Sequence, residues 1–201
     1  MAPALETPRL ILRAFAPGDW PAIDVMLGDP EATRYMHFAH WTDDKRRQWF
    51  DWCIANPEEA DAEAIAWAIT RKVADGVIGW FGIGNSSHPI VRGQRSFGYL
   101  LSPAFWNRGY MTEALLAVLG YEFGRRGTPR VSATCEIANV ASFRVMEKVG
   151  MRREKTVYDA DFESNWAYRH HYAITRAEYG GSLAHRASDD YPADWLFSPP
   201  T

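Results

Sequence analysis

The sequence predicts one α/β domain with a mixed, mainly antiparallel sheet flanked by helices. The chain has 201 residues, which is enough for a single domain with a hydrophobic core. Its first half contains short alternating segments separated by turn signals, which favours a meander of neighbouring strands. Its second half changes to the order helix, strand, helix, strand, strand, which is typical of a sheet covered by helices. No linker composition divides the two halves, so we expect a domain over residues 1–179 and a tail over 180–201.

The first half is predicted to hold one strand, two helices and then three further strands. Asp19 is positioned to cap the first helix, and residues 42–45 look like the start of the second. Asp75-Gly76 is a strong signal for a tight hairpin turn. An acidic run at 58–63 is either a loop that attracts cations or simply a solvated segment. From their alternation, the predicted strands cover residues 9–13, 65–69, 77–83 and 96–101.

Helical periodicity is clearest in the second half. The pattern predicts a long helix over 109–125, although the polar Glu122 interrupts its apolar stripe. A second helix is expected over 139–148, with Gly150 as its C-terminal stop. The tail from Gly180 is rich in Ser, Asp and Pro and is expected to be loose or docked through 195–197. Three strands complete the prediction, over residues 130–137, 152–158 and 168–174.

Composition excludes several classes of protein. The formal net charge of −3 argues against a general nucleic-acid binder, which usually carries a basic excess. No apolar run approaches the ~20 residues that a membrane helix needs, and no signal peptide is visible at the start. Cys53 and Cys135 form neither a CxxC pair nor a Cys/His metal spacing, so we expect no disulfide framework and no metal. A cytoplasmic protein is the resulting expectation.

The segment from 97 to 114 carries the clearest functional signal, since a strand runs through a short loop into a helix. The first turn of a helix offers free N–H groups and the positive end of the helix dipole, which together bind phosphates. Gly109 lacks a Cβ and lets the backbone approach a ligand, and Arg108 adds a positive charge. The alternative is that Asn-Arg-Gly forms an ordinary turn before a helix.

Four segments together resemble the GNAT superfamily of acetyltransferases and, within it, the RimJ/RimL-like branch. The resemblance spans roughly residues 7–175, and it lies in the order and spacing of the segments. Those segments are Thr-Pro-Arg-Leu-Ile-Leu-Arg at 7–13, Val-Ile-Gly-Trp at 77–80, the strand and loop at 97–114, and Asn-Val-Ala-Ser at 139–142 with Glu-Lys-Val-Gly-Met at 147–151.

The resemblance implies splayed central strands that bind acyl-CoA, with acetyl-CoA as the acetyl donor. Two features depart from the family pattern. The loop carries the bulky Trp106 and Met111 at its outer positions, and Ser96 stands where many relatives have a carboxylate. By resemblance, the residues that hold the donor would be Tyr99, Leu100, Leu101, Trp106, Asn107, Arg108, Gly109, Tyr110, Met111, Thr112 and Asn139.

The implied reaction is direct attack of a primary amine on the thioester. Ser142 is the candidate for protonating the leaving thiolate, unless it is only a serine on the helix surface. Glu136 is a candidate base, acting directly or through water, unless its strand turns it outward. Asn139 could also be the N-cap of its helix, a role compatible with binding the donor. Tyr99 and Tyr110 are interpreted as packing residues rather than acids.

The loop between the first helices is the candidate acceptor region. His37, Phe38 and Trp41 could clasp an amine there, or they could simply pack a helix connection. The acceptor would be either a protein N-terminus or a small amine such as an amino sugar, a polyamine or an antibiotic. A homodimer is expected only by analogy with the family. The competing hypothesis is an acyl-CoA-binding sensor that has lost turnover, which the missing carboxylate at Ser96 keeps open.

Overall fold

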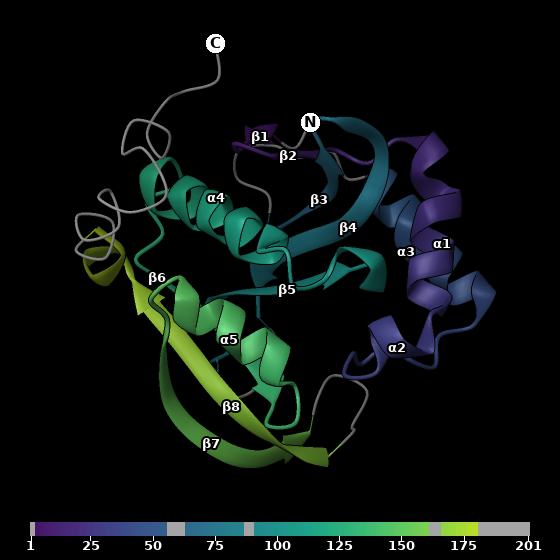
Figure 1. The fold of residues 1–201 in the computed structure, drawn as a ribbon. Helices are drawn as coiled ribbons and strands as arrows, with labels where there is room; N and C mark the ends of the chain where they lie inside the picture. The colour runs from purple at the N-terminus through teal and green to yellow at the C-terminus, as the bar shows by residue number, and fades with distance from the viewer. Residues whose placement is uncertain (1–2, 56–62, 87–90, 161–165, 181–201) are drawn as a thin grey trace.

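The computed structural model describes residues 3–55, 63–86, 91–160 and 166–180 (Figure 1). Residues 58–62 of the acidic run and residues 181–201 of the predicted tail lie outside the described residues. A short helical turn over 176–180 follows the last strand, and Tyr179 packs its buried ring against Phe123. The main helices are α1 (Trp20–Gly28), α2 (Pro30–Thr33), α3 (Asp43–Ala55), α4 (Tyr110–Gly124) and α5 (Val140–Lys148).

Eight strands form one sheet in the order β1-β2-β3-β4-β5-β6-β8-β7. All neighbouring pairs described are antiparallel except β5 with β6, which is parallel. The prediction of a mixed, mainly antiparallel sheet flanked by helices is therefore confirmed. The strands are β1 (Leu5–Glu6), β2 (Leu10–Arg13), β3 (Ala64–Arg71), β4 (Ala74–Asn85), β5 (Arg95–Leu101), β6 (Arg130–Glu136), β7 (Arg152–Ala160) and β8 (Trp166–Thr175).

The two faces of the sheet carry separate hydrophobic clusters. Alternate residues of a strand point to opposite faces, so Trp67 packs with α4 and α5 while Ala68 packs with α1 and α3. β4 shows the same alternation, with Phe81 on the first face and Trp80 on the second. Figure 1 shows α4 and α5 over the middle of the sheet and α1 and α3 beside β4. The sheet therefore lies between two layers of helices, each packed on it through its own hydrophobic cluster.

Two local predictions need correction. The turn between β3 and β4 lies at residues 72–73 rather than at Asp75-Gly76, because β4 already begins at Ala74. Gly76 instead adopts a φ of 111° where the β3–β4 register shifts, which is the behaviour of a bulge. Asp19 occupies the N-cap position of α1, but its side chain does not cap that helix. Its carboxylate accepts from the Ala16 amide at 2.8 Å and pairs with Arg13 at 2.7 Å.

The parallel pair in the centre of the sheet is very short. Arg95 lies beside Val131 and Ser96 lies beside Ser132, and no later residue of β5 pairs with β6 among the described residues. β5 continues to Leu101 paired only with β4, so its edge that faces β6 is open. This divergence produces the predicted splay of the central strands.

A buried ion pair lies where the two strands begin to diverge. Arg95 donates to both carboxylate oxygens of Glu122, at 2.7 and 3.2 Å, and the Glu122 side chain is fully buried. Thr128 donates its hydroxyl to the same carboxylate at 2.5 Å. The interruption of the apolar stripe at Glu122 is therefore a cross-link between α4 and the start of β5.

Candidate functional site

The loop between β5 and α4 has the conformation that an anion-binding turn requires. Asn107 and Gly109 both adopt left-handed backbone angles, with φ of 58° and 76°. Gly109 is the N-cap of α4, and the first helical bond runs from the Glu113 amide to the Gly109 carbonyl at 3.0 Å. The amides before Glu113 lie at the open, positive end of the helix. Residues 106–109 are exposed and Tyr110 and Thr112 are partly exposed, so this end of the helix is open to solvent and to a ligand.

Arg9, the residue before β2, contacts this loop and the start of α4. Its guanidinium pairs with the buried Glu113 carboxylate at 2.6 Å and donates to the Arg108 carbonyl at 3.0 Å. It also lies over the Tyr110 ring at 4.7 Å. Thr7 donates a further bond to Glu113 at 2.6 Å. The loop is thus fixed by a buried carboxylate, and the half-exposed Arg9 adds positive charge beside Gly109.

The two bulky residues of the loop do not fill its opening. Met111 is 6% exposed and its side chain belongs to the hydrophobic core, so it turns away from the exposed amides. Trp106 donates its indole N–H to the Leu101 carbonyl at 2.8 Å, which ties the loop to the end of β5. The departures from the family pattern are therefore accommodated by packing around the loop. The open N-terminal end of α4 is therefore chemically suited to a pyrophosphate.

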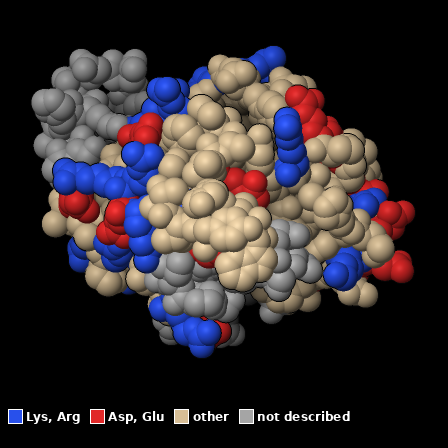
Figure 2. Space-filling model, turned by 90° about the horizontal axis from the view of Figure 1, so that it is seen from below, with Lys and Arg blue, Asp and Glu red and all other residues tan. Residues whose placement is uncertain are grey.

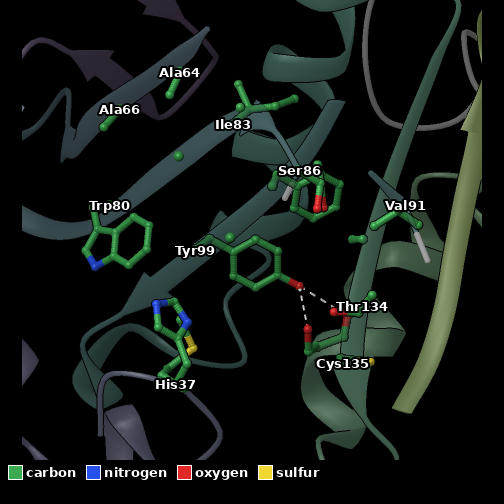
Figure 3. Close-up of a pocket in the computed structure, with 18 of the residues that line it drawn as sticks. His37, Ala64, Ala66, Trp80, Ile83, Ser86, Val91, Tyr99, Thr134 and Cys135 are labelled. Atoms are coloured by element: carbon green, nitrogen blue, oxygen red, sulfur yellow. Dashed lines mark hydrogen bonds between the residues drawn. The ribbon is translucent and has the colours of Figure 1, made fainter. Parts of the chain in front are cut away.

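A cavity of about 380 Å³ begins at the open edge of β5. Tyr99 lines it from the face that carries α4 and α5, whereas Trp80 lines it from the opposite face. The cavity therefore passes beside β5 from one face of the sheet to the other. Figure 3 shows Tyr99 between two walls, with Trp80 and His37 on one side and Thr134 and Cys135 on the other.

Two hydroxyl groups meet inside the cavity. The Tyr99 hydroxyl lies 3.1 Å from Ser142 Oγ and donates to the Ser142 carbonyl at 3.2 Å, as the dashed lines in Figure 3 mark. Burial raises the pKa of Tyr99 far above its ordinary value, so the phenol keeps its proton. Ser142 is half-buried and lines the cavity, which separates it from an ordinary serine on the helix surface. The sequence indicates Tyr99 only as a packing and donor-binding residue, and no local pattern points to this pair of hydroxyl groups.

Asn139 performs the capping role that the sequence left open. Its side-chain oxygen accepts from the Ser142 amide at 3.1 Å, which fixes the first turn of α5 and the direction of Ser142. Asn139 also lines the cavity, so the capping role is compatible with contact to a ligand there. The sequence signal was an ordinary N-cap asparagine.

Glu136 lines the same cavity and lies opposite Arg169 in the β6–β8 register. Its carboxylate is 3.4 Å from the Arg169 guanidinium, whose side chain is 5% exposed. Arg169 in turn donates to the Asp159 carbonyl at 2.6 Å. Glu136 therefore faces the cavity rather than bulk solvent, but as part of an ion pair that the sequence did not reveal.

Cys135 lines the cavity beside Ser142 but is a poor nucleophile. Burial raises the pKa of its thiol to about 12, so the neutral thiol is the species present at neutral pH. Cys53 lies in the other core cluster, and burial raises the pKa of its thiol to about 12 as well. Both cysteines are free thiols. The raised pKa values therefore argue against either thiol as a nucleophile.

Aromatic side chains form the far end of the cavity. His37 reaches it, while Phe38 is 3% exposed and packs behind it against Trp80. Trp41 packs in the same cluster, with its ring 5.2 Å from that of Phe38. Of the predicted acceptor residues, only His37 lines the cavity. Four other aromatic residues that line this end were not predicted, because they come from the turn after α2, from α3 and from β4: Tyr35, Trp49, Trp52 and Trp80.

Within the described residues, no group of three or more His, Cys, Asp or Glu side chains is arranged to hold a metal ion. None of the described helices is long and apolar enough to cross a membrane. The face in Figure 2 carries charges of both signs toward its margins and mostly uncharged residues in the middle.

Known proteins resemble this chain in sequence and in fold. Residues 9–152 match the family described as Acetyltransferase (GNAT) domain. "Uncharacterized N-acetyltransferase YnaD" of Bacillus subtilis (strain 168) is 28% identical over 180 residues, which cover 87% of this chain and 98% of that protein. A GNAT-family acetyltransferase crystal structure from Bacillus anthracis aligns with a TM-score of 0.74 at 25% identity, covering 88% of this chain and all of that one.

A more distant structure shares the fold. RimL, a ribosomal L7/L12 alpha-N-protein acetyltransferase in complex with coenzyme A, aligns with a TM-score of 0.71 at 18% identity, covering 86% of this chain and 98% of that chain. The family match itself extends over 144 positions, from 9 to 152, which is more than half of the 201 residues. This chain therefore belongs to the GNAT family of acetyltransferases.

Proposed function

We propose that this protein is an N-acetyltransferase that moves an acetyl group from acetyl-CoA to a primary amine. The observation that carries the proposal is the pairing of an exposed left-handed loop at Gly109 with a cavity beside the open edge of β5. The loop can hold the diphosphate of the donor while the open edge receives its pantetheine arm and thioester. The four sequence segments and the shared fold of RimL support placement in the RimJ/RimL-like branch.

The acceptor amine must lose its proton before it attacks, because a lysine-like ammonium has a reference pKa of ~10.4. Glu136 is the carboxylate that faces the cavity, and it would take this proton through water. Arg169 holds the carboxylate in place at 3.4 Å. Holding the amine next to the thioester supplies much of the remaining acceleration, since proximity alone lowers the barrier by about 7–11 kcal/mol in favourable cases.

Attack places negative charge on the thioester oxygen. Leu100 pairs with Trp80 of β4, whereas the backbone of the next residue, Leu101, alternates to the open edge of β5, so the Leu101 N–H is the donor that we propose for that oxygen. Such a donor contributes ~3–4 kcal/mol in other acyl-transfer sites. As the intermediate collapses, the nitrogen releases its second proton to water and the CoA thiolate leaves. Ser142 transfers its hydroxyl proton to the thiolate and regains a proton through water, while Tyr99 stays hydrogen-bonded to Ser142. No covalent enzyme intermediate is required.

The protonation step gives a direct prediction for Ser142. Replacing Ser142 by alanine should lower kcat about tenfold, because one donor is lost while Tyr99 remains nearby as a partial substitute. Ser142→Thr retains the hydroxyl and should keep most of the activity. A double Ser142→Ala/Tyr99→Phe variant should lose about a hundredfold in kcat. Steady-state kinetics on all three variants measure this, and an alanine variant with wild-type kcat contradicts the role.

Acetyl transfer itself is tested with the full chain, acetyl-CoA and a panel of amines that includes a protein N-terminal peptide. Free thiol release and the mass of the acetylated amine are followed together, and we expect both to increase with time. The rival hypothesis, a sensor that binds acyl-CoA without turnover, predicts tight CoA binding in calorimetry and no acetylated amine. The hydroxyl pair and the carboxylate in the cavity favour the enzyme, since a sensor has no use for them.

The two buried free thiols support a reducing compartment, so we also propose that the protein is cytoplasmic.

A further inference from the structure

The floor of the cavity consists of backbone and methyl groups on three strands. The register places Ala64 opposite Gly84 and Ala66 opposite Gly82. It also places Gly98 opposite Gly82, so the small residues continue across β5. All of these positions line the cavity and are partly exposed. They share the face of Trp80 and stay partly exposed, so their backbone and methyl groups form the floor beside the Trp80 ring.

Aromatic rings border this floor. A Cβ built on Gly82 would meet Trp80 Cζ3 at 3.4 Å, and one on Gly98 would meet Trp80 Cη2 at 3.9 Å. The benzo ring of Trp80 therefore extends over the edge of the glycine surface. The Trp49 ring packs against the Trp80 ring at a tilt of 52°, with ring centroids 5.1 Å apart, and Trp52 lines the cavity from α3. Figure 3 shows Trp80 between Ala66 and His37. A planar group that lies on the floor would contact an aromatic wall.

Charge in the cavity is balanced. Among the described residues that line it, Glu136 is the only carboxylate and Arg169 is the only side chain of the Lys and Arg type. The two form an ion pair at 3.4 Å. One ammonium can approach Glu136 and lose its proton there. A second ammonium on the same acceptor would find no second carboxylate among the described lining residues, which disfavours its charged form there.

We propose that the acceptor is a small monoamine with a planar aromatic substituent, an arylalkylamine, rather than a polyamine or an amino sugar. The ring would lie on the floor formed by Ala66, Gly82 and Gly98, against the Trp80 and Trp52 walls. A short alkyl chain would then carry the amine toward Glu136 and the thioester. This inference rests on the proposed acetyl transfer and names its substrate class.

The first test compares acceptors on the full chain. 2-Phenylethylamine, spermidine, glucosamine and a peptide with a free N-terminus are assayed with acetyl-CoA, and CoA binding is measured separately by calorimetry. We expect kcat/KM for 2-phenylethylamine to exceed each other value at least tenfold. If CoA binds and another acceptor is preferred, or 2-phenylethylamine is not acetylated, the substrate class is wrong. If CoA does not bind at all, the proposed function fails instead.

The second test locates the aromatic group. Trp52 is 43% exposed, so Trp52→Ala should leave the fold intact while it removes one wall. We expect KM for 2-phenylethylamine to rise about fivefold to tenfold, as loss of an aromatic contact implies, with CoA affinity unchanged. Trp166→Ala is the matched control, because Trp166 is 62% exposed and lies outside the cavity lining. Equal KM values for the two variants overturn the placement of the ring.

A floor variant gives an independent check. Gly98 does not have a positive φ, and a Cβ there would make only ordinary contact with Trp80, so Gly98→Val is compatible with the strand. Its branched side chain would occupy the floor that the ring needs. KM for 2-phenylethylamine should rise at least tenfold, while KM for methylamine, which has no ring, should change less than twofold. Equal changes for both amines contradict the proposal.

Discussion

Replacing Glu122 by alanine is expected to lower the free energy of unfolding by about 3–5 kcal/mol, because it leaves the buried charge of Arg95 without its carboxylate partner. Glu122 is fully buried and the Arg95 side chain is only 10% exposed. Thr128 loses its hydrogen-bond acceptor in the same variant. Urea unfolding monitored by circular dichroism measures the change directly.

A surface ion pair provides the matched control. Glu154 pairs with Arg130, but its side chain is 47% exposed and that of Arg130 is 32% exposed. Glu154→Ala should therefore cost less than about 1 kcal/mol. If Glu122→Ala costs no more than Glu154→Ala, the cross-link between α4 and β5 does not carry the stability assigned to it.

The ion pair need not be more stabilising than an apolar pair of the same size. Buried pairs often break even with hydrophobic replacements, because desolvation of both charges offsets their attraction. The double variant Arg95→Met/Glu122→Leu should therefore recover much of the stability lost by Glu122→Ala. Arg95 belongs to one of the two described residue pairs that join β5 to β6. The CoA affinity of the double variant would therefore show whether the two charges are needed to set the divergence of these strands.

Local signals made the loop and the two helices after it predictable. Gly109 and Asn139 each cap the helix that directly follows them in the sequence. Gly109 is the left-handed N-cap of α4, and the Asn139 side chain caps the first turn of α5. A cap is specified by the residue that forms it, so one sequence is enough to place it. The same reasoning failed at Asp75-Gly76, where the pairing of β3 with β4 moved the turn and left the glycine in a bulge.

The chemistry inside the cavity depends on contacts that local patterns do not encode. Tyr99 and Ser142 are 43 positions apart and meet only because β5 diverges from β6 and α5 packs over the gap. Alternation alone could not decide which way Glu136 points, and its Arg169 partner comes from a strand that follows two further elements. In the sequence, Glu122 only interrupts the apolar face of its helix. Its ion-pair partner Arg95 lies on β5, so the helical pattern does not reveal the pair.

Gly109→Asp should raise the Kd for CoA about a hundredfold. The new carboxylate would stand at the N-cap of α4, among the amides that the diphosphate needs. Repulsion between like charges a few ångströms apart is worth about 2–4 kcal/mol at the partial screening of a protein surface. The left-handed conformation of residue 109 is tolerated by Asp and Asn better than by other side chains, so the loop should still form.

Gly109→Asn separates charge from shape, because it has nearly the same size and no charge. A Cβ at this position would lie 3.4 Å from the Arg9 guanidinium, which is the tip of a half-exposed side chain and can move slightly. The Asn variant should therefore lose less than about tenfold in CoA affinity, the range expected for modest strain at a left-handed residue. Titration calorimetry on both variants measures the difference. Equal losses would mean that only space matters at residue 109, whereas unchanged Kd values for both would remove the diphosphate from this loop altogether.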